Sequence, residues 1–276
     1  MMRFAPLTFA LLLSACTADG GPGLDLESRA IDVEQNAVPT SGAGASQSVS
    51  HLLPATGPTY VTLTVSRADP SNSSDARQAG TQAITSGSGY VVDGSGYVLT
   101  AAHVGVGKGN LVAARAANGR VYSGSVIAIL PNNDMALIRL KGFAGKAVNP
   151  TAPGCVAKGD LVYTLGRPHS KNDVARVGAF EAKHFGRAVA YGKFGYPDAL
   201  VLHMGTQKGE SGGPVFDGNG KLIGMVVSTL SDSNGNSINL AHAIPSTALA
   251  GFYCANATCS PEWAALVNKS VDDCGT

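Results

Sequence analysis

Three short stretches of the chain contain the residue types that catalyse acyl transfer. His103 ends an apolar run, Asp134 opens another, and Ser211 lies within the glycine-rich stretch 209–214. A serine hydroxyl becomes a nucleophile when a base accepts its proton, and histidine is the base whose pKa lies near neutrality. A buried carboxylate then fixes the imidazole tautomer, and glycines permit a turn that aims N–H groups at an oxyanion. Taken singly, the three stretches are explained by a histidine in the core, an aspartate in a turn and a glycine turn. Taken together, they predict a serine hydrolase.

Short apolar runs separated by Gly, Pro or Asn clusters surround these residues. The run 60–65 alternates β-branched and polar residues, and the runs 89–92 and 97–100 form a predicted hairpin. Further runs of this kind span 121–130, 135–140, 160–165, 200–203, 214–216, 222–227 and 238–244. Many short strands with little helix predict an all-β barrel or sandwich. One short C-terminal helix is expected over 260–267, with Ser260 as its N-cap.

At these motifs the sequence resembles the trypsin-like, chymotrypsin-fold serine peptidases, and most strongly their Deg/HtrA branch. The resemblance covers about residues 59–250. It rests on the stretches 87–92, 100–104, 134–137, 159–168, 211–214, 220–224 and 243–245. It implies two six-stranded antiparallel β-barrels, over about 58–150 and 151–250, in a protease domain that spans 58–276.

The resemblance also assigns roles to individual residues. It implies that Ser211 is the nucleophile, His103 the base and Asp134 the orienting acid of a serine endopeptidase that forms an acyl-enzyme. The N–H groups of Gly209 and Ser211 would form the oxyanion hole.

The substrate pocket is implied less specifically. Its positions fall on Gly205, Thr206, Val227, Ser228 and Thr229. Gly205 stands where relatives that select Lys or Arg have Asp, so a small or apolar substrate side chain is favoured. In the alternative, Thr206 together with His242 would favour an acidic one.

Two departures from the family pattern leave a competing hypothesis. Glu210 precedes the nucleophile, where trypsin-like zymogens have Asp and Deg/HtrA proteins usually have Asn. A buried carboxylate needs a cation, and Arg167 and Lys208 are the candidates if Glu210 does not face solvent. Only 26 residues follow residue 250, too few for the PDZ domain of Deg/HtrA proteins, so assembly driven by that domain is not expected. The alternative function is therefore a catalytically weak or inactive protease-fold protein that acts as a binding module.

The first residues have the shape of a secretory signal. Residues 1–15 contain one Arg and an apolar stretch too short to span a membrane. Residues 13–16, Leu-Ser-Ala-Cys, resemble a lipobox, in which Cys16 is acylated and becomes the mature N-terminus; an ordinary cleaved signal is the alternative. Thr17 favours the outer membrane by resemblance to lipoprotein sorting. The expected location is the bacterial cell envelope, lipid-anchored and facing the periplasm. Residues 16–57 have no aromatic residue and are read as a flexible tether.

Charge and cysteine content limit the partners. The 20 Lys+Arg and 19 Asp+Glu residues nearly cancel, so nucleic acid is not an expected partner. Expected partners are a protein or peptide substrate and a membrane reached through lipid, with the oligomeric state open.

Four cysteines remain without Cys16, an even number suited to an oxidising compartment. Of three possible connectivities, nearness favours Cys254–Cys259 and leaves Cys155–Cys274. No metal or cofactor is expected.

Overall fold

The computed structural model describes residues 31–35, 49–68, 83–231, 234 and 237–274. Two groups of strands make up most of it. The first group is β2 (Tyr60–Ser66), β3 (Ala83–Val91), β4 (Tyr97–Thr100), β5 (Leu111–Ala116), β6 (Val121–Leu130) and β7 (Met135–Leu140). The second is β8 (Leu161–Gly166), β9 (Asp173–Ala182), β12 (Leu200–His203), β13 (Pro214–Asp217), β14 (Leu222–Ser231) and β15 (Ser237–Pro245).

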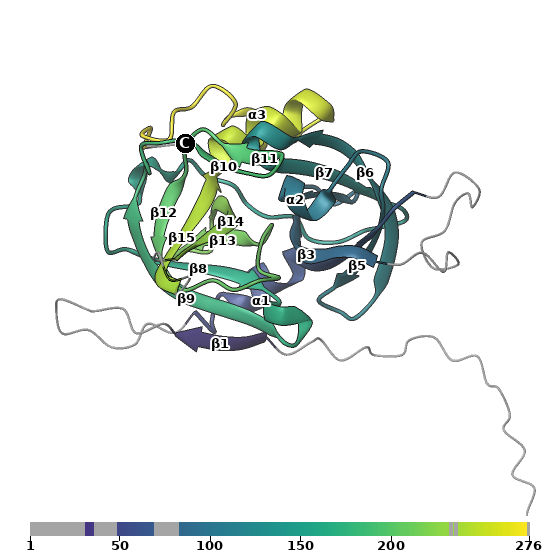
Figure 1. Ribbon diagram of the computed structural model, residues 1–276, viewed down its shortest axis with the longest axis horizontal. Helices are drawn as coiled ribbons and strands as arrows, with labels where there is room; N and C mark the ends of the chain where they lie inside the picture. The colour runs from purple at the N-terminus through teal and green to yellow at the C-terminus, as the bar shows by residue number, and fades with distance from the viewer. Residues whose placement is uncertain (1–30, 36–48, 69–82, 232–233, 235–236, 275–276) are drawn as a thin grey trace, which may run out of the picture.

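Each group closes into a six-stranded antiparallel barrel, and the two barrels lie side by side (Figure 1). The first barrel has the strand order β2-β3-β4-β7-β6-β5. The second has the order β8-β9-β12-β15-β14-β13 and closes because β8 pairs with both β13 and β9. The predicted all-β double barrel is therefore confirmed.

The burial pattern explains which strands the sequence could reveal. Along β6 every second residue is buried, which is the alternation of a strand with one face on a barrel core. By contrast, β9 is buried at eight consecutive positions, which include two charged residues, Asp173 and Arg176. No alternation marks β9, and it is absent from the predicted strands. The strand β5, although its burial alternates, and the hairpin of β10 (Val189–Tyr191) and β11 (Phe194–Tyr196) were not predicted either.

Short helical turns connect the strands. They are α1 (Leu53–Thr56), η1 (Gly57–Thr59), α2 (Ala102–Gly105), η2 (Pro131–Asn133), η3 (Pro153–Cys155) and η4 (Pro168–Ser170). Of these, α2 contains His103, and η2 directly precedes Asp134.

The strand β1 (Ile31–Gln35) corrects the interpretation of residues 16–57 as a flexible tether. It pairs in parallel with the first half of β9, from Ile31↔Asp173 to Gln35↔Val177, and Figure 1 shows it beside β9 at the lower edge of the second barrel. The strand β12 pairs with β9 only from Ala179 onward, so β1 occupies an edge that would otherwise be unpaired. Residues 49–57 are ordered as well, mostly in α1 and η1. The other residues of 16–57, and the predicted signal 1–15 with Cys16, lie outside the described residues.

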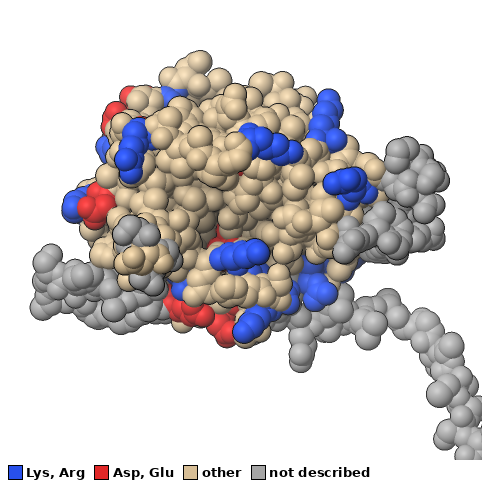
Figure 2. All heavy atoms as spheres, viewed as in Figure 1, with Lys and Arg blue, Asp and Glu red and all other residues tan. Residues whose placement is uncertain are grey.

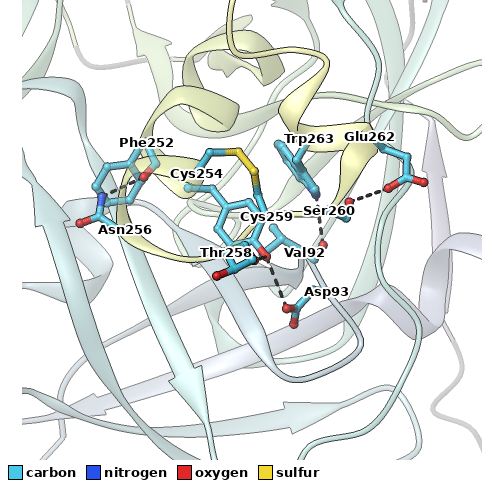
Figure 3. Close-up of a disulfide and its surroundings, with 11 residues drawn as sticks. Val92, Asp93, Phe252, Cys254, Asn256, Thr258, Cys259, Ser260, Glu262 and Trp263 are labelled. Carbon is cyan, nitrogen blue, oxygen red and sulfur yellow. Dashed lines mark hydrogen bonds between the residues drawn. A yellow bond between two sulfur atoms is a disulfide. The ribbon is translucent and has the colours of Figure 1, made fainter.

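The C-terminal segment, residues 246–274, crosses back to the first barrel. It begins with α3 (Ser246–Asn256), which was not predicted, and continues with α4 (Pro261–Ala264), inside the expected helix 260–267. Trp263 is buried, and its Nε1 donates to the carbonyl oxygen of Val92 at 3.1 Å (Figure 3). The segment is therefore anchored to the hairpin that precedes His103.

Two disulfides hold this segment, in the pairing that sequence spacing favours. Cys254 and Cys259 are joined at the turn between α3 and α4 (Figure 3). Cys274 is joined to Cys155, across 119 residues, at the start of the second barrel. The segment thus contacts both barrels.

No helix among the described residues is long and apolar enough to cross a membrane. On the face drawn in Figure 2 the Lys and Arg side chains stand apart from one another and form no continuous basic patch. This distribution agrees with the nearly balanced charge of the chain.

Candidate active site

His103 lies where the first barrel's hairpin ends. The strand β4 pairs with β7 as far as Thr100↔Ala136, and the chain then turns into the single helical turn α2. This pairing brings His103 over the start of β7, directly after Asp134. The His103 side chain is 26% exposed whereas that of Asp134 is fully buried, so the imidazole has one side in the protein and one side open.

Asp134 fixes the orientation of that imidazole. His103 Nδ1 lies 2.9 Å from Oδ2 and 3.1 Å from Oδ1, and the His103 backbone N–H donates to Oδ1 at 3.0 Å. Asp134 adopts a left-handed conformation with φ 46° and ψ 45°, which costs a non-glycine residue about 1–3 kcal/mol. The carboxylate keeps the ring proton on Nδ1 and so leaves Nε2 free to act as a base.

An aromatic hairpin covers the same pair, and sequence reasoning missed it. The hydroxyl of Tyr191 on β10 donates to Oδ2 of Asp134 and lies 3.4 Å from His103 Nδ1. The rings of Tyr191 and Phe194 approach His103 edge-on, with centroids 5.8 and 6.3 Å away. Burial and the neighbouring Asp134 raise the pKa of Tyr191, so the hydroxyl keeps its proton and remains a donor. The aromatic residues clustered within Tyr191–Tyr196 were the sequence feature that could have indicated this hairpin.

Ser211 lies in the loop between β12 and β13 of the second barrel, and this loop packs against the first barrel. Ser88 N–H donates to the carbonyl oxygen of Ser211 at 2.9 Å. At Gly212, with φ +83°, a Cβ would lie 2.2 Å from the Ser88 carbonyl oxygen and 2.3 Å from Thr100 Oγ1. Only glycine permits this approach. The structure therefore brings the loop that contains Ser211 against the end of β4, which leads into His103.

Gly209 has the backbone geometry expected of an oxyanion loop. Its φ is +101°, and a Cβ there would lie 2.4 Å from the carbonyl oxygen of Arg167. The hydroxyl of Ser88 donates to the Gly209 carbonyl oxygen at 2.8 Å, and the carbonyl oxygen of Lys208 accepts from His169 N–H at 2.7 Å. Contacts from both barrels therefore hold this loop.

Glu210 is fully buried and paired, but with a residue that the sequence did not suggest. Arg176 Nε, on β9, lies 3.0 Å from Oε1 and 3.2 Å from Oε2 of Glu210. Gln207 N–H also donates to Oε2. The candidates Arg167 and Lys208 are thus wrong, because barrel closure places β9, not the adjoining loop residues, beneath Glu210. Burial raises the pKa of Glu210, and the charge of Arg176 opposes that rise.

The predicted pocket residues are only partly brought together. Thr206 and Thr229 are joined by a hydroxyl hydrogen bond of 2.6 Å, and Val227 is buried. Ser228 bonds instead to the hydroxyl of Tyr196 at 2.7 Å. His242 Nδ1 bonds to the same hydroxyl at 2.8 Å, so this nitrogen is engaged with Tyr196 and not with Thr206.

A groove of about 330 Å³ lies on another side of the loop, between the barrels. Gly209, Ser86 and Ser170 line it together with two cationic residues, Arg115 and Arg167, and none of its lining residues is acidic. None of the predicted pocket residues lines it. Among the described residues no group of three or more His, Cys, Asp or Glu could hold a metal ion.

Two closed antiparallel barrels, with a buried aspartate–histidine pair on one and a glycine-rich serine loop on the other, define the double-barrel serine peptidase class. Residues 87–225, half of the chain, match the trypsin-like peptidase domain family. The chain belongs to this family, in its Deg/HtrA branch.

Curated relatives support this branch. The chain is 30% identical over 180 residues to a probable periplasmic serine endoprotease DegP-like of Bartonella henselae, which covers 65% of this chain and 35% of that protein. It is 29% identical over 175 residues to the putative serine protease HhoB of Synechocystis, covering 62% of this chain and 39% of that protein. The chain thus spans about a third of the length of these relatives.

Solved structures share the fold. The HtrA-type protease AlgW with tripeptide has a TM-score of 0.59 at 22% identity, over 72% of this chain and 60% of that one. The inactive form of the Rv3671c protease has a TM-score of 0.59 at 21% identity, over 75% and 93%.

Proposed function

We propose that this chain is a serine endopeptidase whose catalytic triad is Ser211, His103 and Asp134. The observation that carries the proposal is the buried carboxylate of Asp134 on Nδ1 of His103, at the strand end against which the Ser211 loop packs. With Nδ1 bound to Asp134, Nε2 is the ring nitrogen left to serve as the base for Ser211.

The reaction follows from these positions. Nε2 of His103 accepts the proton of Ser211 as Oγ attacks the carbonyl carbon, and the N–H groups of Gly209 and Ser211 stabilise the oxyanion. The protonated imidazole then donates its proton to the leaving amine, the C–N bond breaks, and an ester forms on Ser211. Water enters by the same route, with His103 again the base, and releases the acid and the free serine.

Substrates are proteins or peptides. The hydrogen-bonded hydroxyls of Thr206 and Thr229 and the buried Val227 support a small or apolar side chain before the cleaved bond. The groove beside Gly209 would bind the substrate residues on the other side of the cleaved bond. Its two arginines favour an acidic substrate side chain there.

Labelling with a fluorophosphonate, followed by peptide mapping, tests the proposal directly. Ser211 of the wild type should be modified, Ser211→Ala should be neither labelled nor active on casein, and His103→Ala should lose nearly as much activity. Because the two residues act as one unit, the double variant should be little worse than either single variant. An unreactive Ser211 in folded protein would favour the alternative, a binding module that keeps the fold.

For the location we propose the periplasmic face of the bacterial envelope, with a lipid on Cys16 as the anchor and the outer membrane as the favoured membrane. The names of the periplasmic relatives and the lipobox-like residues 13–16 support this proposal. Cys16→Ser should move the protein from the membrane to the soluble periplasmic fraction with its peptidase activity intact. Retention of that variant on membranes would contradict lipid anchoring.

A further inference from the structure

A chain of three charged side chains connects the N-terminal strand β1 to the residue that precedes the nucleophile. Arg176 Nη1 lies 2.9 Å from Oε2 of Glu34 on β1, while its Nε lies 3.0 Å from Oε1 of Glu210. The Arg176 side chain is 3% exposed, that of Glu210 is fully buried, and that of Glu34 is 49% exposed. One guanidinium is therefore held from both ends, by the nucleophile loop inside and by β1 outside.

The strand pairing makes this contact specific. Glu34 and Arg176 are register partners in the parallel β1–β9 pair, so their side chains leave the sheet on the same face. The half-buried Ile31 and Val33 pack β1 onto the core. In Figure 2 acidic spheres lie at the lower edge of the molecule, where β1 stands in Figure 1.

We infer that Glu34 is a positioning residue for the reaction proposed above: through Arg176 and Glu210, it holds the Gly209–Ser211 loop in its catalytic shape. A lone guanidinium on a long side chain has several rotamers, and a second carboxylate on its other nitrogen selects one of them. That rotamer directs Nε at Glu210, whose backbone lies between the two proposed oxyanion donors. Docking of the N-terminal segment and turnover are thereby coupled.

The test compares Glu34→Gln with Asp32→Asn in the full chain. Asp32 stands two residues earlier on the same exposed face of β1, so both substitutions remove one negative charge from one strand. Glu34→Gln should lower kcat by about three- to tenfold and leave KM within about twofold, whereas Asp32→Asn should match the wild type. Both variants should keep the wild-type circular dichroism spectrum.

Salt provides a second measurement. The Glu34–Arg176 contact is half exposed and is screened by ions, so raising NaCl from about 0.05 to 0.5 M should lower the wild-type kcat toward that of Glu34→Gln. The Glu34→Gln variant itself should respond little. Equal kcat values for Glu34→Gln and Asp32→Asn at every salt concentration would overturn the inference.

An NMR measurement separates this inference from the proposed function on which it rests. In Glu34→Gln the amide resonances of Gln207, Gly209 and Ser211 should shift, and in Asp32→Asn they should not. This comparison requires no activity. An unreactive Ser211 in the wild type would end the proposed function, whereas unshifted amides in Glu34→Gln would end the role of Glu34.

Discussion

Replacing Glu210 with Ala should cost this protein more catalysis than stability. The substitution removes the acceptor for Arg176 Nε and for the Gln207 N–H and leaves Arg176, only 3% exposed, beside Glu34 alone. Breaking a buried ion pair by removing one partner costs about 3–5 kcal/mol. Because Glu34 remains on the guanidinium and the loop can relax toward water, we expect a loss of about 2 kcal/mol in the free energy of unfolding.

The catalytic loss follows from where the loop relaxes. Glu210 lies between Gly209 and Ser211, so its release should misplace at least one of the two proposed oxyanion donors. The expected fall in kcat/KM is about ten- to a thousandfold, the range for one lost donor. The measurement is the turnover of one peptide per active site. The active sites are titrated with a fluorophosphonate, so that unfolded protein is excluded from the enzyme concentration.

Two further variants make the reasoning refutable. Glu210→Ala combined with Arg176→Met removes the orphaned charge and should regain stability without regaining activity. Glu210→Asn should also be impaired, because an amide forms no ion pair with Arg176. A more active Glu210→Asn enzyme would mean that Glu210 restrains the loop, and unchanged turnover in both Glu210 variants would deny it any role.

Three other predictions concern separate parts of the fold. Tyr191→Phe removes a donor to the carboxylate of Asp134 and should lower kcat by about tenfold with KM unchanged, which steady-state kinetics will check. His242 is buried, and burial with the nearby charge of Arg187 lowers its pKa from 6.5 to about 4. The unfolded chain therefore takes up a proton first as pH falls, and up to about 3 kcal/mol of stability should be lost between pH 6.5 and 4. Urea unfolding at several pH values should show a flatter dependence in His242→Gln. Opening the Cys155–Cys274 link, which closes a 119-residue loop, by Cys155→Ser should lower the unfolding free energy by about 4 kcal/mol, whereas a smaller loss in chemical denaturation would indicate residual structure in the unfolded chain.

The sequence predicted the parts of this fold that local chemistry specifies. The strand β6 has alternating burial, and turn residues occupy positions 93–96 between β3 and β4. Local patterns of this kind predict a strand and a hairpin. The residues of the proposed triad could be named because each stands in a short stretch that resembles a family motif. The structure then brings His103 and Asp134 within 2.9 Å.

The parts that the sequence did not predict depend on distant pairing. The partner of Glu210 lies 34 residues away on β9, a strand buried so fully that it has no periodic pattern. The contact of Tyr191 with Asp134 joins the two barrels across 57 residues. The strand β1 is polar at alternate positions and short, and only the unpaired edge of β9 gives it a place. Pairing between distant segments, not local propensity, creates each of these contacts.

The C-terminal segment has a consequence for how the molecule unfolds. It leaves the second barrel through α3, packs Trp263 on Val92 of the first barrel, and returns to the second through Cys274. Opening either barrel would detach this segment from the surface of that barrel and expose the buried indole of Trp263. Calorimetry should therefore record a single cooperative transition for both barrels. The first sign of local opening should be amide exchange at the loop 205–213. The C-terminal segment is attached at Val92 and Cys155, so this loop is held instead by its hydrogen bonds with Ser88, His169 and Arg176.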